Sequence, residues 1–132
     1  MSKHERLCAR KDIENLFKNG KYLNLNGLKI VYLVNQNSKT ENVKILISVP
    51  KRLYKKASDR NLIKRRVREA YRKNKSILKE NINKLNLELH IAFIISSNKM
   101  PNYAEIETKI LVSLQTLNNS LITTQRNNEN KE

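Results

Sequence analysis

The sequence predicts an α+β fold, a small two-layer sandwich in which helices cover a β-sheet. Three runs rich in apolar and β-branched residues, at positions 28–34, 43–49 and 89–95, are typical of strands. Around them lie three segments whose apolar residues recur every three or four positions, the period of a helix. The resulting order is helix, strand, strand, helix, strand, helix (αββαβα), with an additional short strand near 21–26.

The first helix is expected at residues 10–19. Ile13, Leu16 and Phe17 stand at positions i, i+3 and i+4, so they share one face of that helix. Gly20 follows at the position where a left-handed C-terminal cap would sit. The segment is therefore predicted to be a short amphipathic helix that ends at this glycine.

The next two strands are expected to form a hairpin. The runs 28–34 and 43–49 are separated by the polar stretch 35–42, which suits an antiparallel connection. Pro50 ends the second of these strands, because it lacks the N–H that a central strand would need. A basic loop is predicted at 51–56.

A second helix is expected after this loop. Ser58 is its predicted N-cap, and Asp59 stands in the first turn, where a negative charge is favourable. The helical pattern continues to about Lys75 and, less regularly, to Lys84. The run 89–95 that follows is uniformly apolar, so we expect a strand at the centre of the sheet.

The last helix is predicted to begin at Tyr103 and to cover one face of the sheet. Residues 123–132 hold no apolar side chain, and we expect them to form a disordered polar tail. The chain is thus interpreted as one domain at 1–122 followed by this tail. The apolar residues of the last helix recur at intervals of three or four: Ile106, Ile110, Leu114, Leu117 and Leu121.

Composition excludes several classes of protein. No run approaches the roughly 18 consecutive apolar residues of a membrane span, and the N-terminus leads into no apolar signal-peptide core. We therefore expect a cytoplasmic protein without a membrane partner. Cys8 is the only cysteine and His4 and His90 are the only histidines, so neither an intramolecular disulfide nor a structural zinc site is predicted.

Positive charge is concentrated in one part of the chain. The 132 residues hold 27 Lys+Arg and 12 Asp+Glu, a net charge of +15. Residues 51–75 carry twelve basic side chains and two acidic ones, so they supply +10 of this total. Such a concentration predicts a polyanionic partner, and nucleic acid is the first candidate.

The second predicted helix has a basic face and an apolar face. At 100° per residue, the apolar residues Ile63, Val67 and Ala70 lie on the side of the helix opposite a set of polar and basic residues, which we call the polar group. Arginine suits phosphates and stacked or bidentate contacts with bases, and asparagine can bond a base edge or a 2′-hydroxyl, so RNA fits as well as DNA. The polar group consists of Asn61, Lys64, Arg65, Arg68 and Arg72.

No catalytic site of the protein itself is predicted. A protein nuclease normally needs clustered carboxylates that hold metal ions, or a histidine acid/base pair. Asp59 and Glu69 are ten residues apart and about 80° apart around the helix, so they do not converge on one ion.

Phe17 and Tyr32 are candidates for a stacking platform for unpaired bases, although a phenylalanine at helical spacing is more often part of a core.

One stretch resembles the signature of the bacterial ribonuclease P protein subunit family. It runs from Ser48 to Arg52, through Lys55-Lys56-Ala57, and on through residues 60–72. The resemblance continues in Arg6-Leu7, Asp12-Ile13 and Leu16-Phe17-Lys18-Asn19-Gly20 and in the order of elements, so it covers roughly residues 5–120.

The resemblance implies a fold and a function. The fold is an α+β sandwich with a left-handed βαβ crossover. The protein is the small subunit of a ribonucleoprotein whose RNA is the catalyst. The complex removes the 5′ leader of precursor tRNA with Mg²⁺ held mainly by the RNA. The implied partners are this catalytic RNA and precursor tRNA, and no protein partner is required by the sequence.

The resemblance also assigns roles to residues. Ile13, Phe17 and Tyr32 would line a cleft between the first helix and the sheet that binds the leader. The residues that would contact the catalytic RNA are Arg60, Asn61, Lys64, Arg65 and Arg68. Lys51 and Arg52 would extend this surface, and Arg72 shares the same helix face.

Two positions depart from the family pattern. Position 62 is Leu where the family usually has Arg, so that contact is absent or is replaced by Arg66. Ile13 stands where the family often has an aromatic residue, which removes stacking of about 1 kcal/mol or more per base.

Composition alone permits a structural RNA-binding protein of ribosomal type equally well. A DNA-bending protein would need an apolar wedge, and none is apparent in the sequence.

Overall fold

The computed structural model describes residues 6–35, 43–78, 82 and 87–130. The elements in chain order are α1 (Arg10–Asn19), β1 (Lys21–Leu25), β2 (Leu28–Asn35), β3 (Val43–Ser48), α2 (Ala57–Asn74), β4 (Glu88–Ile95) and α4 (Tyr103–Asn130). The predicted α+β class is confirmed, and β1 is the additional short strand expected near 21–26.

The four strands form one sheet in the order β1-β2-β4-β3. β1 pairs with β2 and β2 pairs with β4 in antiparallel fashion, whereas β3 pairs with β4 in parallel. The central position of β4, expected from its uniformly apolar sequence, is confirmed. The parallel pair requires a crossover from β3 to β4, and this crossover contains α2. Its left hand stays a prediction of the resemblance.

The predicted hairpin between residues 28–34 and 43–49 is wrong. β4 lies between β2 and β3, so these two strands do not pair with each other. β4 is apolar on both of its faces, and a position between two strands and two layers buries both. The hairpin that does form joins β1 to β2, where Leu25 pairs with Leu28 across the two-residue turn Asn26-Gly27.

The backbone conformations of Gly20 and Gly27 differ from the expectation. Gly27 in the β1–β2 turn has a φ of 86°, the left-handed conformation that the sequence analysis assigned to Gly20. Gly20 instead has an extended backbone, with φ −73° and ψ 161°. A Cβ at Gly20 would collide with the carbonyl oxygen of Leu16 and lie 2.9 Å from Val31, so glycine permits a close approach there.

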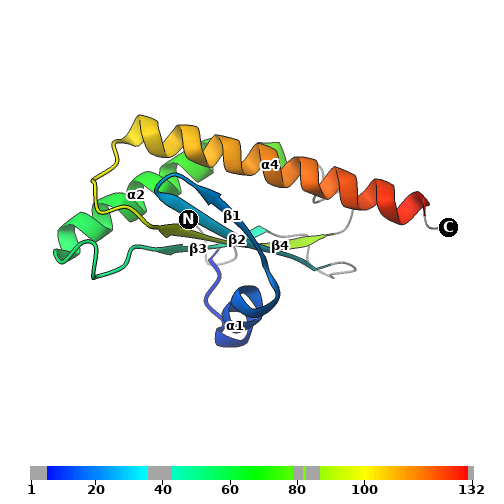
Figure 1. The fold of residues 1–132 in the computed structure, drawn as a ribbon, viewed down its shortest axis with the longest axis horizontal. Coiled ribbons are helices and arrows are strands. Elements are labelled where there is room, and N and C mark those ends of the chain that lie inside the picture. Colours follow the sequence, from blue (N-terminus) through cyan, green and yellow to red (C-terminus); the bar gives the residue numbers. More distant parts are fainter. Residues whose placement is uncertain (1–5, 36–42, 79–81, 83–86, 131–132) are drawn as a thin grey trace.

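Helices cover the two faces of the sheet unequally. In Figure 1, α2 and α4 lie on one side of the sheet and α1 lies on the other. Alternate residues of each strand face opposite sides, so Ile45 and Phe93 belong to the larger core beneath α2 and α4. Val31 and Ala92 belong to a smaller core with Leu16 of α1. The residues predicted as the apolar stripe of the last helix are all buried: Ile106, Ile110, Leu114, Leu117 and Leu121.

Two helix boundaries differ from expectation. α2 begins at Ala57, so Ser58 lies inside the first turn, and the N-cap residue Lys56 makes no side-chain capping bond. After a turn at Lys75 the chain is helical again at 76–78, and most of the predicted continuation to Lys84 lies outside the described residues.

The last helix is longer than the sequence analysis expected. α4 continues to Asn130, so the tail expected from residue 123 is helical at 123–130. The reason is that no Gly or Pro follows Pro101, and polar side chains alone do not end a helix. Among the helices of the described residues, none is long and apolar enough to cross a membrane.

Candidate nucleic-acid interface

Helix α2 buries one face and exposes the other, as its sequence pattern predicted. Ile63, Val67 and Ala70 are fully buried beneath it. Arg65 and Arg68 point outward, and within the described part of the chain no ion pair or hydrogen bond engages their guanidinium groups. Together with the exposed Asn61 and the half-buried Lys64, they form what we call the outer face of α2: Asn61, Lys64, Arg65 and Arg68.

Three other arginines of α2 are engaged by the protein itself. Nη1 of Arg60 donates to the carbonyl oxygens of Tyr54 and Lys55 at 2.8 and 3.0 Å. Nη1 of Arg66 donates to the carbonyl oxygen of Pro101 at 2.8 Å. Arg66 is therefore occupied in holding the start of α4, which disfavours the suggestion that it replaces the arginine absent at position 62.

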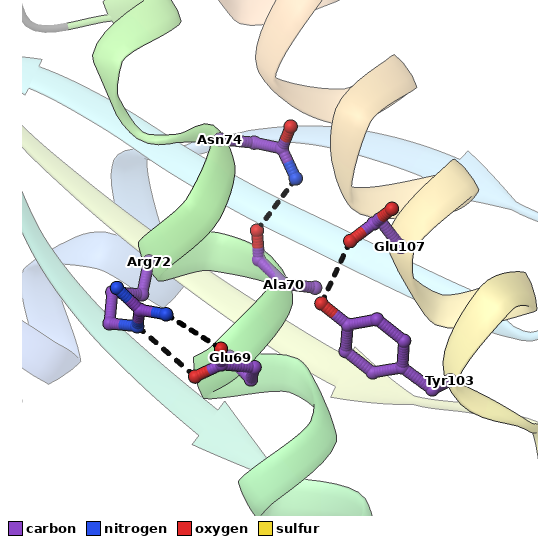
Figure 2. A network of polar contacts seen from close by, with 6 residues as sticks. All are labelled: Glu69, Ala70, Arg72, Asn74, Tyr103 and Glu107. Atoms are coloured by element: carbon purple, nitrogen blue, oxygen red, sulfur yellow. Dashed lines mark hydrogen bonds and ion pairs between the residues drawn. The ribbon is translucent and has the colours of Figure 1, made fainter.

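Arg72, predicted to contact RNA, forms a two-pronged ion pair with Glu69. Its Nε and Nη2 donate to the two carboxylate oxygens at 3.1 and 2.7 Å (Figure 2). The hydrogen bond from Arg72 lowers the pKa of the Glu69 carboxyl. The positive charge of Arg72 is thus largely balanced within the helix, unlike the charges of Arg65 and Arg68.

The junction of α2 with α4 lies beside this pair (Figure 2). The Tyr103 hydroxyl donates to Glu107 at 2.8 Å, and this bond, more than burial, raises the pKa of Tyr103 to about 12. Nζ of Lys73 lies 5.4 Å from the centre of the Tyr103 ring, within range of a cation–π contact. The Lys73–Tyr103 contact therefore joins the C-terminal half of α2 to α4, and the bond to Glu107 within α4 holds the tyrosine in place.

Lys51 and Arg52 are exposed on the turn that follows β3. The turn is closed by backbone bonds from Leu53 and Tyr54 to the carbonyl oxygen of Pro50, at 3.1 and 3.2 Å. The Tyr54 hydroxyl also donates to the carbonyl oxygen of Ser97 at 2.8 Å. Burial, followed by the Asp59 charge, raises the pKa of Tyr54, so this donor keeps its proton. The turn is therefore anchored to the loop after β4 and to α2 through Arg60.

The three residues expected to line the leader cleft do not lie together. Ile13 of α1 packs against the smaller core, and Phe17 of the same helix is 36% exposed. Tyr32 packs against the larger core on the opposite face of the sheet and lines a small cavity with Leu121 of α4. The placement of Tyr32 between α1 and the sheet is thus wrong, because in β2 the residues that face α1 are Val31 and Leu33.

The exposed aromatic residue beside Phe17 is Tyr22, which the sequence analysis missed. Tyr22 pairs with Val31 across β1 and β2, so it shares the α1 side of the sheet. It is 64% exposed, and its hydroxyl donates to the carbonyl oxygen of Phe17 at 2.9 Å. The Asn26-Gly27 dipeptide was the available signal, since it sets the hairpin register that places Tyr22 on this side.

The described residues do not fit a magnesium site of the protein's own. They contain no group of three or more His, Cys, Asp or Glu side chains close enough to hold an ion. Glu69, the acid nearest the outer face of α2 in sequence, is paired with Arg72. A surface of unpaired cations attracts phosphates and repels a divalent cation.

Comparison with known proteins identifies both the family and the fold of this chain. The ribonuclease P family model matches residues 1–118. The chain is similar to the ribonuclease P protein component of two strains of Porphyromonas gingivalis, with 34% identity over 114 residues, 86% of this chain and 83% of each relative. It is also similar to the corresponding protein of Borrelia turicatae, with 26% identity over 103 residues, covering 77% of this chain and 82% of the relative.

Solved structures agree with the fold described above. The ribonuclease P protein of Thermotoga maritima superposes with a TM-score of 0.68 at 26% identity, covering 85% of this chain and 96% of that one. The Staphylococcus aureus protein superposes with a TM-score of 0.67 at 23% identity over 87% of this chain and 95% of its own, a likeness of fold. The extent of the family match and the identity to the Porphyromonas relatives show that this chain belongs to the ribonuclease P protein family.

Proposed function

We propose that this chain is the protein subunit of a ribonuclease P ribonucleoprotein and assists the RNA-catalysed removal of the 5′ leader from precursor tRNA. In this proposal it binds the catalytic RNA with the outer face of α2 and the turn at Lys51 and Arg52. It contacts the leader with the exposed aromatic residues beside α1. The protein acts in the cytoplasm, and it needs no further protein subunit.

The observation that carries the proposal is the outer face of α2 in a member of this family. Arg65 and Arg68 are exposed and one turn apart, and no described residue balances their charges. Arginine forks match phosphate oxygens, and the Asn61 amide between them and the N-terminus of α2 suits a base edge or a 2′-hydroxyl. Binding such a face to RNA releases condensed counterions, which drives association.

The protein assists cleavage by charge and position in this proposal. Magnesium belongs to the RNA, where it supplies the chemistry of phosphodiester hydrolysis. The cations of α2 reduce the repulsion between RNA phosphates that the metal would otherwise have to screen. The expected consequence is that the RNA needs less magnesium when the protein is bound.

The leader contact rests on Phe17 and Tyr22 together. An exposed aromatic pair on the α1 side offers stacking to unpaired bases without requiring a particular sequence. Ile13 adds apolar area next to Phe17 on the same helix. A contact of this kind distinguishes precursor tRNA from mature tRNA, because mature tRNA has no leader.

The experiment is cleavage of a precursor tRNA at low magnesium, with the catalytic RNA of the same organism tested with and without this protein. Correct 5′ cleavage that depends on both components supports the proposal. The R65A/R68A variant serves as the matched control, since it leaves the buried face of α2 intact. If the protein binds the RNA but never assists cleavage, the alternative of a structural RNA-binding protein of ribosomal type takes its place.

A further inference from the structure

A polar cavity lies at the end of the sheet that carries the β1–β2 turn. It has a volume of about 540 Å³ and is bounded by the β1–β2 turn, the loop after β4 and Leu53. Leu53 belongs to the turn after β3 that also holds Lys51 and Arg52, which we call the basic turn. We call it the sheet-end basin. Its polar lining consists of Asn24, Asn26, Lys29, Ser96, Ser97 and Asn98.

The walls of the sheet-end basin are held in place by hydrogen bonds that involve the backbone. The N–H of Ser96 donates to the carbonyl oxygen of Gly27 at 3.0 Å, which joins the loop after β4 to the β1–β2 turn. The carbonyl oxygen of Ser97 accepts from the Tyr54 hydroxyl, and its side-chain oxygen accepts from the N–H of Lys99 at 3.2 Å. The basin is therefore a formed feature of the fold rather than a gap between independent loops.

Lysines lie around the basin. Lys29 lines it directly. A neighbouring cavity of about 230 Å³ is lined by Lys99 and Lys109 together with a single acid, Glu105. Nζ of Lys109 lies 3.3 Å from where a Cβ of Gly27 would be, so the absence of a side chain at that glycine leaves room for the amine. The lysines give this end of the sheet a positive charge.

The amide groups in the basin have no partners among the residues that the structure describes. Asn24, Asn26 and Asn98 are exposed, and no hydrogen bond to their side chains is formed within that part of the chain. Each amide offers two donor hydrogens and an acceptor oxygen. Such groups can bond the edge of a base or a 2′-hydroxyl.

The chemistry of the lining favours RNA over other ligands. Sites for drug-like small molecules are lined mainly by apolar and aromatic side chains, and stable protein interfaces have an apolar centre. The sheet-end basin has neither, since among the described residues Leu25 and Leu53 are its only large apolar wall residues and both are half-buried. It is also continuous with the basic turn, because Leu53 directly follows Lys51 and Arg52.

We propose that the sheet-end basin is a second RNA-contact site that holds an unpaired nucleotide, with the asparagine amides on its base or ribose and Lys29 and Lys109 on the flanking phosphates. The site differs from the outer face of α2 because three neutral asparagine amides contribute hydrogen bonds beside the charges of the lysines. The identity of the RNA rests on the proposed function: it is the catalytic RNA or the precursor tRNA, and both offer the same nucleotide chemistry.

Two variants of the full-length protein separate the two contributions. N24A/N98A removes two amides, and we expect the Kd for the catalytic RNA to rise about three- to tenfold with no change in its salt dependence. K29Q/K109Q removes two charges, and we expect the slope of log K against log salt to fall by up to about one per lysine. The matched control is Q115A/N119A, which removes two exposed amides of α4 outside the basin.

Binding of the catalytic RNA and of precursor tRNA is measured for each variant. Weaker binding of the catalytic RNA by N24A/N98A, with the control within about twofold of the wild type, supports the site. Unchanged binding of that RNA with weaker binding of precursor tRNA by the holoenzyme also supports it and identifies the substrate as the source of the nucleotide. Should circular dichroism show that N24A/N98A is unfolded, the nearly isosteric N98D is used, and we expect it to bind more weakly because it adds a negative charge.

The proposal is overturned if the basin variants bind both RNAs like the control. The failure of the proposed function is a separate result, since it appears in the wild-type protein as a lack of assistance to cleavage. A wild-type protein that assists cleavage while the basin variants match the control therefore overturns only the second site.

Discussion

Helix α2 carries two groups of arginines that differ in what their guanidinium groups contact. Arg65 and Arg68 face outward without a described partner, whereas Arg60 and Arg66 donate to backbone carbonyl oxygens and Arg72 pairs with Glu69. All five have the same chemistry and lie within thirteen positions of each other. A run of basic residues thus holds both side chains that are free for a partner and side chains that hold the fold together, and the tertiary contacts decide which is which.

The largest effect is expected from removing the outward arginines. R65A/R68A should weaken binding of the catalytic RNA by about tenfold or more and reduce the salt slope by up to about one unit per residue. The midpoint of thermal unfolding should stay close to that of the wild type, because neither side chain contacts the core. Binding measured from low to high salt tests this, and unchanged slopes would show that the outer face of α2 does not contact RNA.

The contrast between exposed side chains and side chains packed in the fold can also be tested on the aromatic residues. F17A/Y22A should weaken binding of precursor tRNA by about 1–3 kcal/mol per stacked base and hardly alter binding of mature tRNA. Y32A is the matched comparison, because Tyr32 packs on the opposite face of the sheet. Equal losses for the two RNAs with F17A/Y22A, in a protein whose circular dichroism is unchanged, would refute the leader contact.

Arg66 should behave in the opposite way to Arg65. R66A removes the bond to the Pro101 carbonyl oxygen, and a hydrogen bond from a charged donor is worth about 1.5–3 kcal/mol of unfolding free energy. Its salt slope for RNA binding should equal that of the wild type. Urea unfolding and salt titration of the same variant check the two halves of the prediction, and a changed slope with unchanged stability would move Arg66 to the RNA-contact group.

The smallest effect is expected at Glu69. E69Q releases Arg72 from its ion pair, so RNA binding should become slightly tighter and more salt-dependent. R72Q should change RNA binding less than a single R68A substitution does. The contrary result, with R72Q and R68A equally weak, would show that RNA displaces Glu69 from Arg72.

The sequence predicted the features that depend on local periodicity. The buried stripe of Ile63, Val67 and Ala70 follows from a spacing of three or four, and the central place of β4 follows from its uniform apolar character. The basic outer face of α2 was likewise visible as the complement of the buried stripe.

Features that depend on distant contacts could not be predicted in this way. Pro101, which accepts the bond from Arg66, is 35 residues away in the sequence. Strand alternation relates Tyr32 to Ile30, but it does not say which face of the sheet α1 will cover. The pairing of β2 with β4 in place of β3 is a choice among strands far apart in the chain, and a polar connecting segment carries little information about it.

The position of β4 has a consequence for the order in which the protein can fold during translation. β2 and β3 are both synthesised before the strand that must lie between them, and about 5–20 residues are added per second. The ribosome therefore needs a few seconds, on the order of 2–10 s, between the end of β3 and the end of β4. During that interval two strand edges are unpaired and exposed to other chains. Helix α2 is synthesised within that interval but has no finished sheet beneath it, so a nascent chain cannot hold the outer face of α2 in a fixed orientation until β4 has emerged.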